Sequence, residues 1–177
     1  DFFPKKRGLF MTDIFPAIES GEIKALWLVA TNPLTSMPNT TRIRKTLEKL
    51  EFCVVQDAYA DVESAQYANV FFPASVWAEK DGCFTNTERR VNRVTPVAKP
   101  LANTRPDLWI FSQLAKRWEQ GREMTFPDTA AEVFEEMKAL SVGAGANGQP
   151  RILDISGMDY DKILEQRGIQ WPMRSGD

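Results

Sequence analysis

The 177-residue sequence contains no histidine and only two cysteines, Cys53 and Cys83. Without histidine the chain cannot form a Ser-His-Asp triad, a Cys-His pair or a histidine-ligated metal site. Two cysteines are too few for a disulfide framework, and their spacing matches no zinc or iron–sulfur motif. These absences exclude most self-contained catalytic schemes, and we assign no catalytic residue and no metal ligand to this chain.

A strong excess of charge and a long apolar run are also lacking. Twenty-two Lys and Arg residues oppose 24 Asp and Glu residues, for a formal net charge of -2. This balance provides no general attraction to nucleic acid or to an anionic membrane, and we expect neither as a partner. No apolar run approaches the roughly 18 residues needed to cross a bilayer. The 43% hydrophobic content is instead typical of a globular domain.

Three short apolar segments predict buried β-strands, at residues 25–30, 52–55 and 70–72. An amphipathic helical segment that Asn39 caps lies between the first two strands, and a shorter helical segment at about 62–67 lies between the second and the third. Strands that alternate with crossover helices form right-handed βαβ units. The sequence therefore predicts an α/β fold with an open, mainly parallel sheet and helices on both faces, similar to a Rossmann domain.

Four further helices and one connector complete the predicted organisation. The helices run from Asp13 to Ser20 after a Thr12 cap, from Thr104 towards Gly121, onward from Pro127, and from Asp159 to Gln166. The glycine-rich residues 143–150 predict a flexible connector between an α/β domain at 1–142 and a C-terminal appendage at 151–177. Because the sequence starts with Asp1 and no signal peptide follows, we expect it to be part of a longer protein.

Polar residues follow the first two predicted strands. Thr31-Asn32-Pro33 ends the first strand and Gln56-Asp57 ends the second. Ligands of open parallel sheets bind beyond the carboxyl ends of the strands, where an acid can bind a ribose or a base. The alternative interpretation is that these residues form helix caps and turns. No G-x-G-x-x-G or P-loop motif is present to favour the nucleotide interpretation.

The densest polar stretch, residues 79–90, follows the third predicted strand. Gly82 permits a tight turn, Asn86 offers an amide, and Arg89 and Arg90 offer guanidinium groups suited to phosphate or carboxylate. The alternative is a solvated loop that leads into a strand at 91–94. Cys83 lies in this stretch without a histidine base or a CxxC partner, which disfavours a reactive thiol.

A basic helical face is interpreted as solvated surface rather than as a docking site for an acidic redox partner. It consists of Arg42, Arg44, Lys45 and Lys49.

Taken in order, these motifs resemble the molybdopterin oxidoreductase family, also called the dimethyl sulfoxide reductase superfamily. The resemblance extends from about Gly21 to Trp118 and rests on four stretches: Gly21–Trp27 leading to Thr31-Asn32-Pro33, Val54-Val55-Gln56-Asp57, Ala68–Ser75 and Glu79–Arg90. Gly168-Ile169-Gln170-Trp171-Pro172 is similar to a segment of nitrate reductases and some formate dehydrogenases. In detail the sequence is most similar to assimilatory nitrate reductase catalytic subunits.

The resemblance implies a bis(molybdopterin guanine dinucleotide) cofactor with molybdenum, and it divides the candidate cofactor-binding residues into two groups. The first group, placed against one guanosine and its diphosphate, is Thr31, Asn32, Pro33, Gln56 and Asp57. The second group, placed towards the pterin, is Gly82, Asn86, Glu88, Arg89 and Arg90. The [4Fe-4S] cluster and the molybdenum ligand of the family are not in this chain, so the isolated chain should not turn over substrate.

The resulting hypothesis is a cofactor-binding domain of a cytoplasmic nitrate reductase, which reduces nitrate to nitrite with electrons from an iron–sulfur relay. Its partners would be the rest of its own catalytic subunit and an electron-donor protein or reductase subunit. The alternatives are part of a formate dehydrogenase and a non-catalytic α/β module that binds nucleotides or other proteins.

Overall fold

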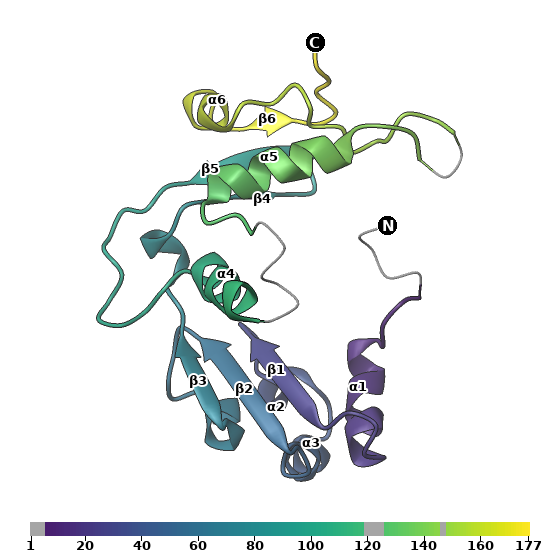
Figure 1. Ribbon diagram of the computed structural model, residues 1–177, viewed down its shortest axis with the longest axis vertical. Coiled ribbons are helices and arrows are strands. Elements are labelled where there is room, and N and C mark those ends of the chain that lie inside the picture. Colours follow the sequence, from purple (N-terminus) through teal and green to yellow (C-terminus); the bar gives the residue numbers. More distant parts are fainter. Residues whose placement is uncertain (1–5, 119–125, 146–147) are drawn as a thin grey trace. The chain divides into compact units, whose positions relative to one another are not determined.

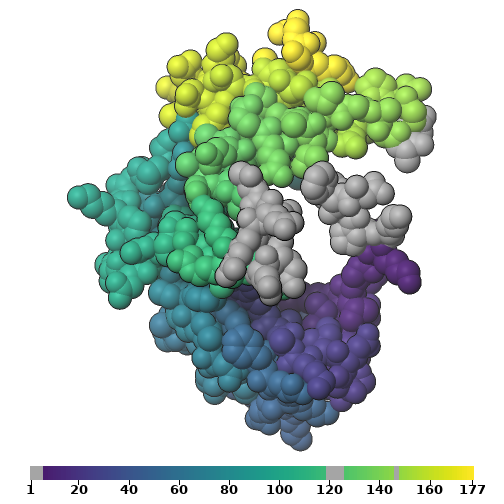
Figure 2. All heavy atoms as spheres, in the orientation of Figure 1, coloured from purple at the N-terminus to yellow at the C-terminus, as the bar shows by residue number. Residues whose placement is uncertain are grey.

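The computed structural model describes residues 6–118, 126–145 and 148–177 of the chain. These residues belong to two compact units, Asp1–Ala74 and Ser75–Asp177. Figure 1 shows the elements of each unit, and Figure 2 shows the heavy atoms in the same colours. Among the described residues, no helix is long and apolar enough to cross a membrane.

A parallel three-stranded sheet in the order β1-β2-β3 forms the centre of the first unit (Figure 1). The strands are β1 (Ala25–Val29), β2 (Phe52–Asp57) and β3 (Val70–Pro73). In register, Leu28 lies opposite Val55, and Val55 lies opposite Phe71. These apolar segments form strands because each is short and rich in β-branched and aromatic residues. The predicted α/β fold with a parallel sheet is confirmed.

One face of this sheet is packed against helices. Leu28, Cys53 and Val55 are buried there together with partly buried Leu26 and Phe71. Leu26 also contacts a second cluster contributed by α1 (Met11–Glu19), α2 (Pro33–Ser36) and α3 (Thr40–Leu47). Its buried members are Phe15, Ile18, Leu34, Ile43 and Leu47. Cys53, only 1% exposed, is a core side chain as predicted.

The helix ends of the first unit agree only in part with the sequence prediction. Asn39 caps α3, because its Oδ1 accepts a hydrogen bond from the Arg42 N–H at 3.2 Å. Thr12 does not cap α1, which begins at Met11 after Phe10, so that Pro16 lies inside the helix instead of in its first turn. The crossover between β2 and β3 is a short 3₁₀ helix, η1 (Glu63–Tyr67).

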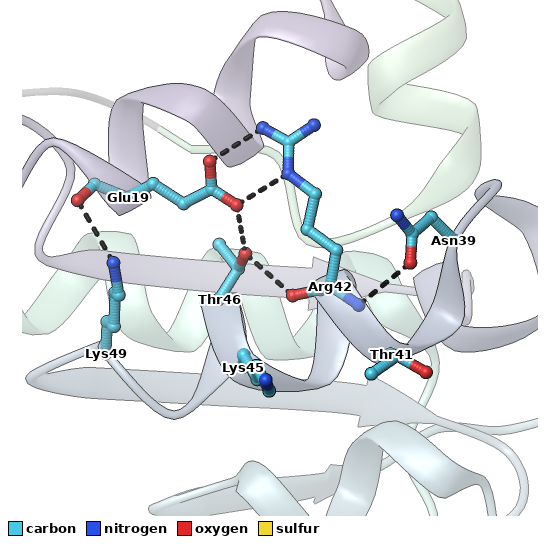
Figure 3. Close-up of a pocket in the computed structure, with 7 residues that line it drawn as sticks. All are labelled: Glu19, Asn39, Thr41, Arg42, Lys45, Thr46 and Lys49. Carbon is cyan, nitrogen blue, oxygen red and sulfur yellow. Dashed lines mark hydrogen bonds and ion pairs between the residues drawn. The ribbon is translucent and has the colours of Figure 1, made fainter.

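An ion pair joins α1 to α3 (Figure 3). Arg42 donates from Nε and Nη2 to the two carboxylate oxygens of Glu19, at 2.7 and 2.6 Å. The Thr46 hydroxyl donates to Glu19 Oε1 at 2.8 Å. These hydrogen bonds lower the pKa of Glu19 from 4.5 to about 2. The carboxylate therefore stays ionised through most of the acidic range.

The second unit contains an antiparallel sheet in the order β4-β5-β6. Its strands are β4 (Gly82–Thr85), β5 (Arg90–Val94) and β6 (Ile169–Gln170), and its helices are α4 (Asp107–Arg117), α5 (Ala130–Ser141), α6 (Tyr160–Glu165) and the 3₁₀ helix η2 (Trp77–Glu79). The buried core is Val91, Phe134, Ile155, Met158, Tyr160, Ile163 and Ile169. Residues from β5, α5, α6 and β6 thus share one apolar cluster.

Several elements of the second unit differ from the prediction. Residues 82–85, expected within a polar loop, form β4, and β6 was not predicted. Thr104 does not cap α4, because its hydroxyl donates to the Leu101 carbonyl at 2.8 Å. Thr129 caps α5 in a capping box with Glu132, two residues beyond Pro127.

Two further predictions concern residues 119–177. Gly121, the expected end of α4, lies outside the described residues. The expected connector at 143–150 and appendage at 151–177 fall inside the second unit. The domain boundary at 143–150 stays a prediction.

The Glu19 contact predicts how stability depends on pH. The folded pKa of Glu19 lies below the ordinary value of 4.5, so its stabilising contribution is present above that pH. It is lost as the pH falls from about 4.5 towards about 2. We expect the urea midpoint of the wild-type chain to fall more steeply over this window than that of Glu19→Gln. Glu22 is an exposed carboxylate next to the same helix, so Glu22→Gln should behave like the wild type. If the urea midpoints of all three proteins fall equally steeply with pH, Glu19 does not stabilise the fold in this way.

Candidate functional site

The first candidate group lies at the carboxyl edge of the β1-β2-β3 sheet. After β1 the chain passes through Ala30, in the left-handed region with φ of 50°, and reaches the loop Thr31–Pro33. Val29 is in register with Gln56, and the Ala30 N–H donates to the Gln56 carbonyl at 2.9 Å. The ends of β1 and β2 are thus held side by side. The structure brings the loop and the pair Gln56-Asp57 to one edge.

Asn32 uses its side chain to organise this edge. Its Oδ1 accepts a hydrogen bond from the Leu34 N–H at 3.2 Å and so caps α2, in which Pro33 is the first residue. Its Nδ2 donates to Glu63 Oε2 at 2.5 Å. Because Glu63 belongs to η1, this bond ties the loop after β1 to the segment after β2. Glu63 was not predicted, and no motif in the sequence marks it.

Asp57 ends β2 with a half-buried carboxylate. Its Oδ1 accepts a hydrogen bond from the Tyr59 N–H at 3.0 Å, and its carbonyl accepts one from the Ala74 N–H at 2.9 Å. The turn thus fixes one carboxylate oxygen of Asp57. The second oxygen of an aspartate can also accept hydrogen bonds from N–H or O–H groups. Gln56, in contrast, is fully buried. Asp57 is therefore the side chain at this edge best suited to hold a polar ligand group.

The second candidate group lies in the hairpin of β4 and β5. Asn86 closes the turn, because its Oδ1 accepts hydrogen bonds from the Glu88 and Arg90 N–H groups at 3.0 and 3.2 Å. The Arg89 N–H donates to the Asn86 carbonyl at 3.0 Å, and Arg89 has a positive φ of 59°. Gly82 is the first residue of β4. In this group the asparagine shapes the backbone, as capping asparagines do in turns.

Contacts from the C-terminal segment hold the same hairpin. Arg90 Nη1 donates to the Gly168 carbonyl at 2.7 Å. The Arg89 guanidinium lies 5.9 Å from the centre of the Trp171 ring, and the backbone N–H of Trp171 donates to the Arg89 carbonyl at 2.8 Å. Gly168 has a φ of 103°, and a Cβ there would lie 2.4 Å from Asn92 Oδ1. A side chain at position 168 would therefore disturb the pairing of the two segments.

The hairpin also contains the second cysteine. Cys83 lies opposite Arg93 in the antiparallel pair. Loss of solvation and the nearby Asp81 carboxylate raise the pKa of its thiol to about 11. The thiol is then protonated at neutral pH and is a poor nucleophile. Within the described ranges, no group of three or more Cys, Asp or Glu side chains could hold a metal ion.

Comparison with known proteins identifies the class of protein that this fold belongs to. The family model for molybdopterin oxidoreductase matches residues 3–117. The chain belongs to the molybdopterin oxidoreductase family, as the resemblance predicted. Membership implies a molybdopterin and molybdenum.

Curated relatives of the chain are mostly nitrate reductases. The nitrate reductase of Synechocystis sp. is 37% identical over 170 residues, which cover 96% of this chain and 23% of that protein. The assimilatory nitrate reductase catalytic subunit of Bacillus subtilis is 33% identical over 178 residues, covering 100% of this chain and 24% of the relative. The F420-dependent formate dehydrogenase 2 subunit alpha of Methanococcus maripaludis is 34% identical over 154 residues, with coverage of 87% and 21%. The chain thus spans less than a quarter of the length of these relatives.

A solved structure shares the fold. Acetylene hydratase from Pelobacter acetylenicus matches with a TM-score of 0.66 and 20% sequence identity. The match covers 90% of this chain and 20% of that structure. At this level of identity the likeness supports the fold alone.

The bond between Asn32 and Glu63 can be tested by exchanging donor and acceptor. Asn32→Asp keeps an oxygen to cap α2 but turns a carboxylate towards Glu63, and we expect it to lower the free energy of unfolding by about 1 kcal/mol. Adding Glu63→Gln restores a donor and should recover most of this loss. Urea denaturation measures both, with Glu63→Gln alone as the matched control. If the double variant is as unstable as Asn32→Asp, the bond does not join the two segments.

Proposed function

We propose that the carboxyl edge of the β1-β2-β3 sheet binds the guanosine diphosphate end of a molybdopterin guanine dinucleotide. The observation that carries this proposal is the register of β1 and β2, which places the loop Thr31–Pro33 beside Gln56-Asp57. A guanine presents adjacent N–H donors on one edge, and a ribose presents hydroxyls. The carboxylate of Asp57 has an oxygen to accept such groups while Tyr59 holds the other.

In this proposal the residues of the first group have different tasks. Asp57 contacts the guanine or the ribose, and Thr31 offers its hydroxyl and backbone to the phosphates. Asn32 is a positioning residue, because its amide is used by Leu34 and Glu63. Pro33 begins α2 and Gln56 is buried behind the edge, so both support the shape of the site. When bound, the cofactor supplies the redox chemistry of molybdenum, and the protein sets its orientation.

For the second group we propose contact with the pterin side of the cofactor. Glu88 and Arg89 are the exposed charged side chains of the hairpin turn, with hydrogen-bonding groups that could meet a pterin ring. Asn86 and Arg90 hold the turn and its C-terminal partner segment, and Gly82 begins the first strand. We propose further that the cofactor is the bis form and that a [4Fe-4S] cluster belongs to other parts of the full protein.

For the activity of the full protein we propose the reduction of nitrate to nitrite. This is supported by the nitrate reductases that match nearly the whole chain at 33–37% identity. Formate oxidation is the second candidate activity, because a formate dehydrogenase is among the relatives. The partners we propose are the rest of the catalytic subunit and an electron-donor protein or reductase subunit, in the cytoplasm.

The role of Asp57 predicts a loss of cofactor. In the full-length protein, Asp57→Asn keeps an oxygen for the Tyr59 N–H but removes the charge and offers fewer acceptors. We expect the molybdenum and guanine contents per polypeptide to fall together, by about tenfold if one strong hydrogen bond is lost. Asp61→Asn, at an exposed carboxylate in the following segment, is the matched control. Wild-type contents of both in Asp57→Asn would contradict this role.

The proposed substrate predicts the outcome of a direct assay. With a reduced viologen dye, the full-length protein should form nitrite from nitrate with a two-electron stoichiometry. The same preparation should not reduce an oxidised dye with formate. Formate-dependent dye reduction without nitrite formation would assign the protein to the second candidate and leave the cofactor site as proposed.

A further inference from the structure

An open pocket of about 400 Å³ lies between the end of α1 and the exposed side of α3 (Figure 3). Its lining residues are Glu19, Asn39, Thr41, Arg42, Lys45, Thr46 and Lys49. All belong to the first unit, and none is a member of either candidate cofactor-binding group. The pocket is thus a separate feature of the surface.

The pocket has an excess of positive charge. Arg42 and Lys45 lie in α3, three residues apart. Lys49 follows in the turn after the helix, where its backbone N–H donates to the Thr46 carbonyl at 3.1 Å. All three basic side chains line the pocket. Glu19 is the one acidic residue in the lining, so three cations minus one carboxylate leave an excess of two positive charges. This excess occurs in a chain whose net charge is -2.

The hydrogen bonds and the ion pair within the pocket leave much of its positive charge available to bind an anionic ligand. Both oxygens of Glu19 are turned towards Arg42, as Figure 3 shows. Lys49 donates to the Glu19 carbonyl at 3.3 Å, which does not neutralise its charge. Among the described residues Lys45 has no hydrogen-bond or ion-pair acceptor. Cations in the last turn of a helix interact favourably with the helix dipole. Like charges four residues apart nevertheless repel each other.

The remaining polar groups at the pocket can donate hydrogen bonds. Asn39 turns its carbonyl oxygen to the Arg42 N–H, which leaves its amide nitrogen at the end of the pocket where Thr41 also lies (Figure 3). Lys45 and Lys49, which no carboxylate neutralises in the part of the chain that the structure describes, are four residues apart, a rise of about 6 Å at helical pitch. This span fits acidic side chains two residues apart on an extended peptide, where alternate side chains share one face and lie about 7 Å apart.

We infer that this pocket, whose basic residues the sequence alone assigns to solvated surface, is a docking surface for an acidic polypeptide segment of a partner protein. The lining contains no aromatic ring on which a nucleic-acid base could stack. The inference does not depend on the proposed cofactor site.

The test uses the full-length protein and a fluorescent peptide in which glutamate recurs at every second position, so that the carboxylates share one face of the extended peptide. Fluorescence anisotropy should show binding that weakens several-fold between about 50 and about 200 mM salt. Lys45→Glu combined with Lys49→Glu should weaken binding by at least about tenfold, and the corresponding double change to Gln by less. Lys99→Glu makes the same change at an exposed lysine outside the pocket and should leave the affinity within about twofold.

Three results would overturn the inference. The first is unchanged affinity in the Lys45 and Lys49 double variants, with melting curves like that of wild type. The second is tighter binding of a single-stranded oligonucleotide of equal charge that the same variants abolish, which would assign the surface to nucleic acid. The third is displacement of the peptide by low millimolar inorganic phosphate, which would make the pocket a site for small anions. If the Glu variants do not fold, the double Gln variant decides between these results.

Discussion

The register of the parallel sheet is the constraint on which the candidate site depends. Leu28, Val55 and Phe71 lie opposite one another on the face that packs against the helices. A shift of β2 by one residue would turn Val55 out of the core and expose apolar surface, so burial holds the strand in place. The same register sets the end of β1 beside Gln56. The position of the polar edge is therefore a consequence of apolar packing in the strands below it.

Much of the polar chemistry around the site serves to position the backbone. The amide of Asn32 joins the loop after β1 to η1, and the side-chain oxygen of Asn86 closes a hairpin. Both residues were predicted as ligand contacts, Asn32 from its place after the first strand and from the family resemblance, and Asn86 from its amide and the same resemblance. Their hydrogen bonds show that these two asparagines determine the shape of the candidate loops in which they lie. The charged side chains, Asp57 and Arg89, are then the better candidates for direct contact.

The parts of the fold that could be predicted are those set by local sequence. Apolar runs located β1, β2 and β3, and Asn39 marked the start of α3. β6 has two residues and pairs with β5, about eighty positions earlier in the chain, so no local pattern reveals it. Thr12 and Thr104 were expected as caps, but a threonine hydroxyl also bonds other nearby carbonyls, as Thr104 does. Likewise, the partnership of Asn32 with Glu63 exists only after the sheet has formed.

The most direct test of the central claim is a structure of the full-length protein with its cofactor bound. The account predicts the guanosine end at the carboxyl edge of the β1-β2-β3 sheet, with an oxygen of the Asp57 carboxylate within hydrogen-bond distance of the base or the ribose. A guanosine located elsewhere, with Asp57 and the loop Thr31–Pro33 facing only solvent or protein, would contradict it.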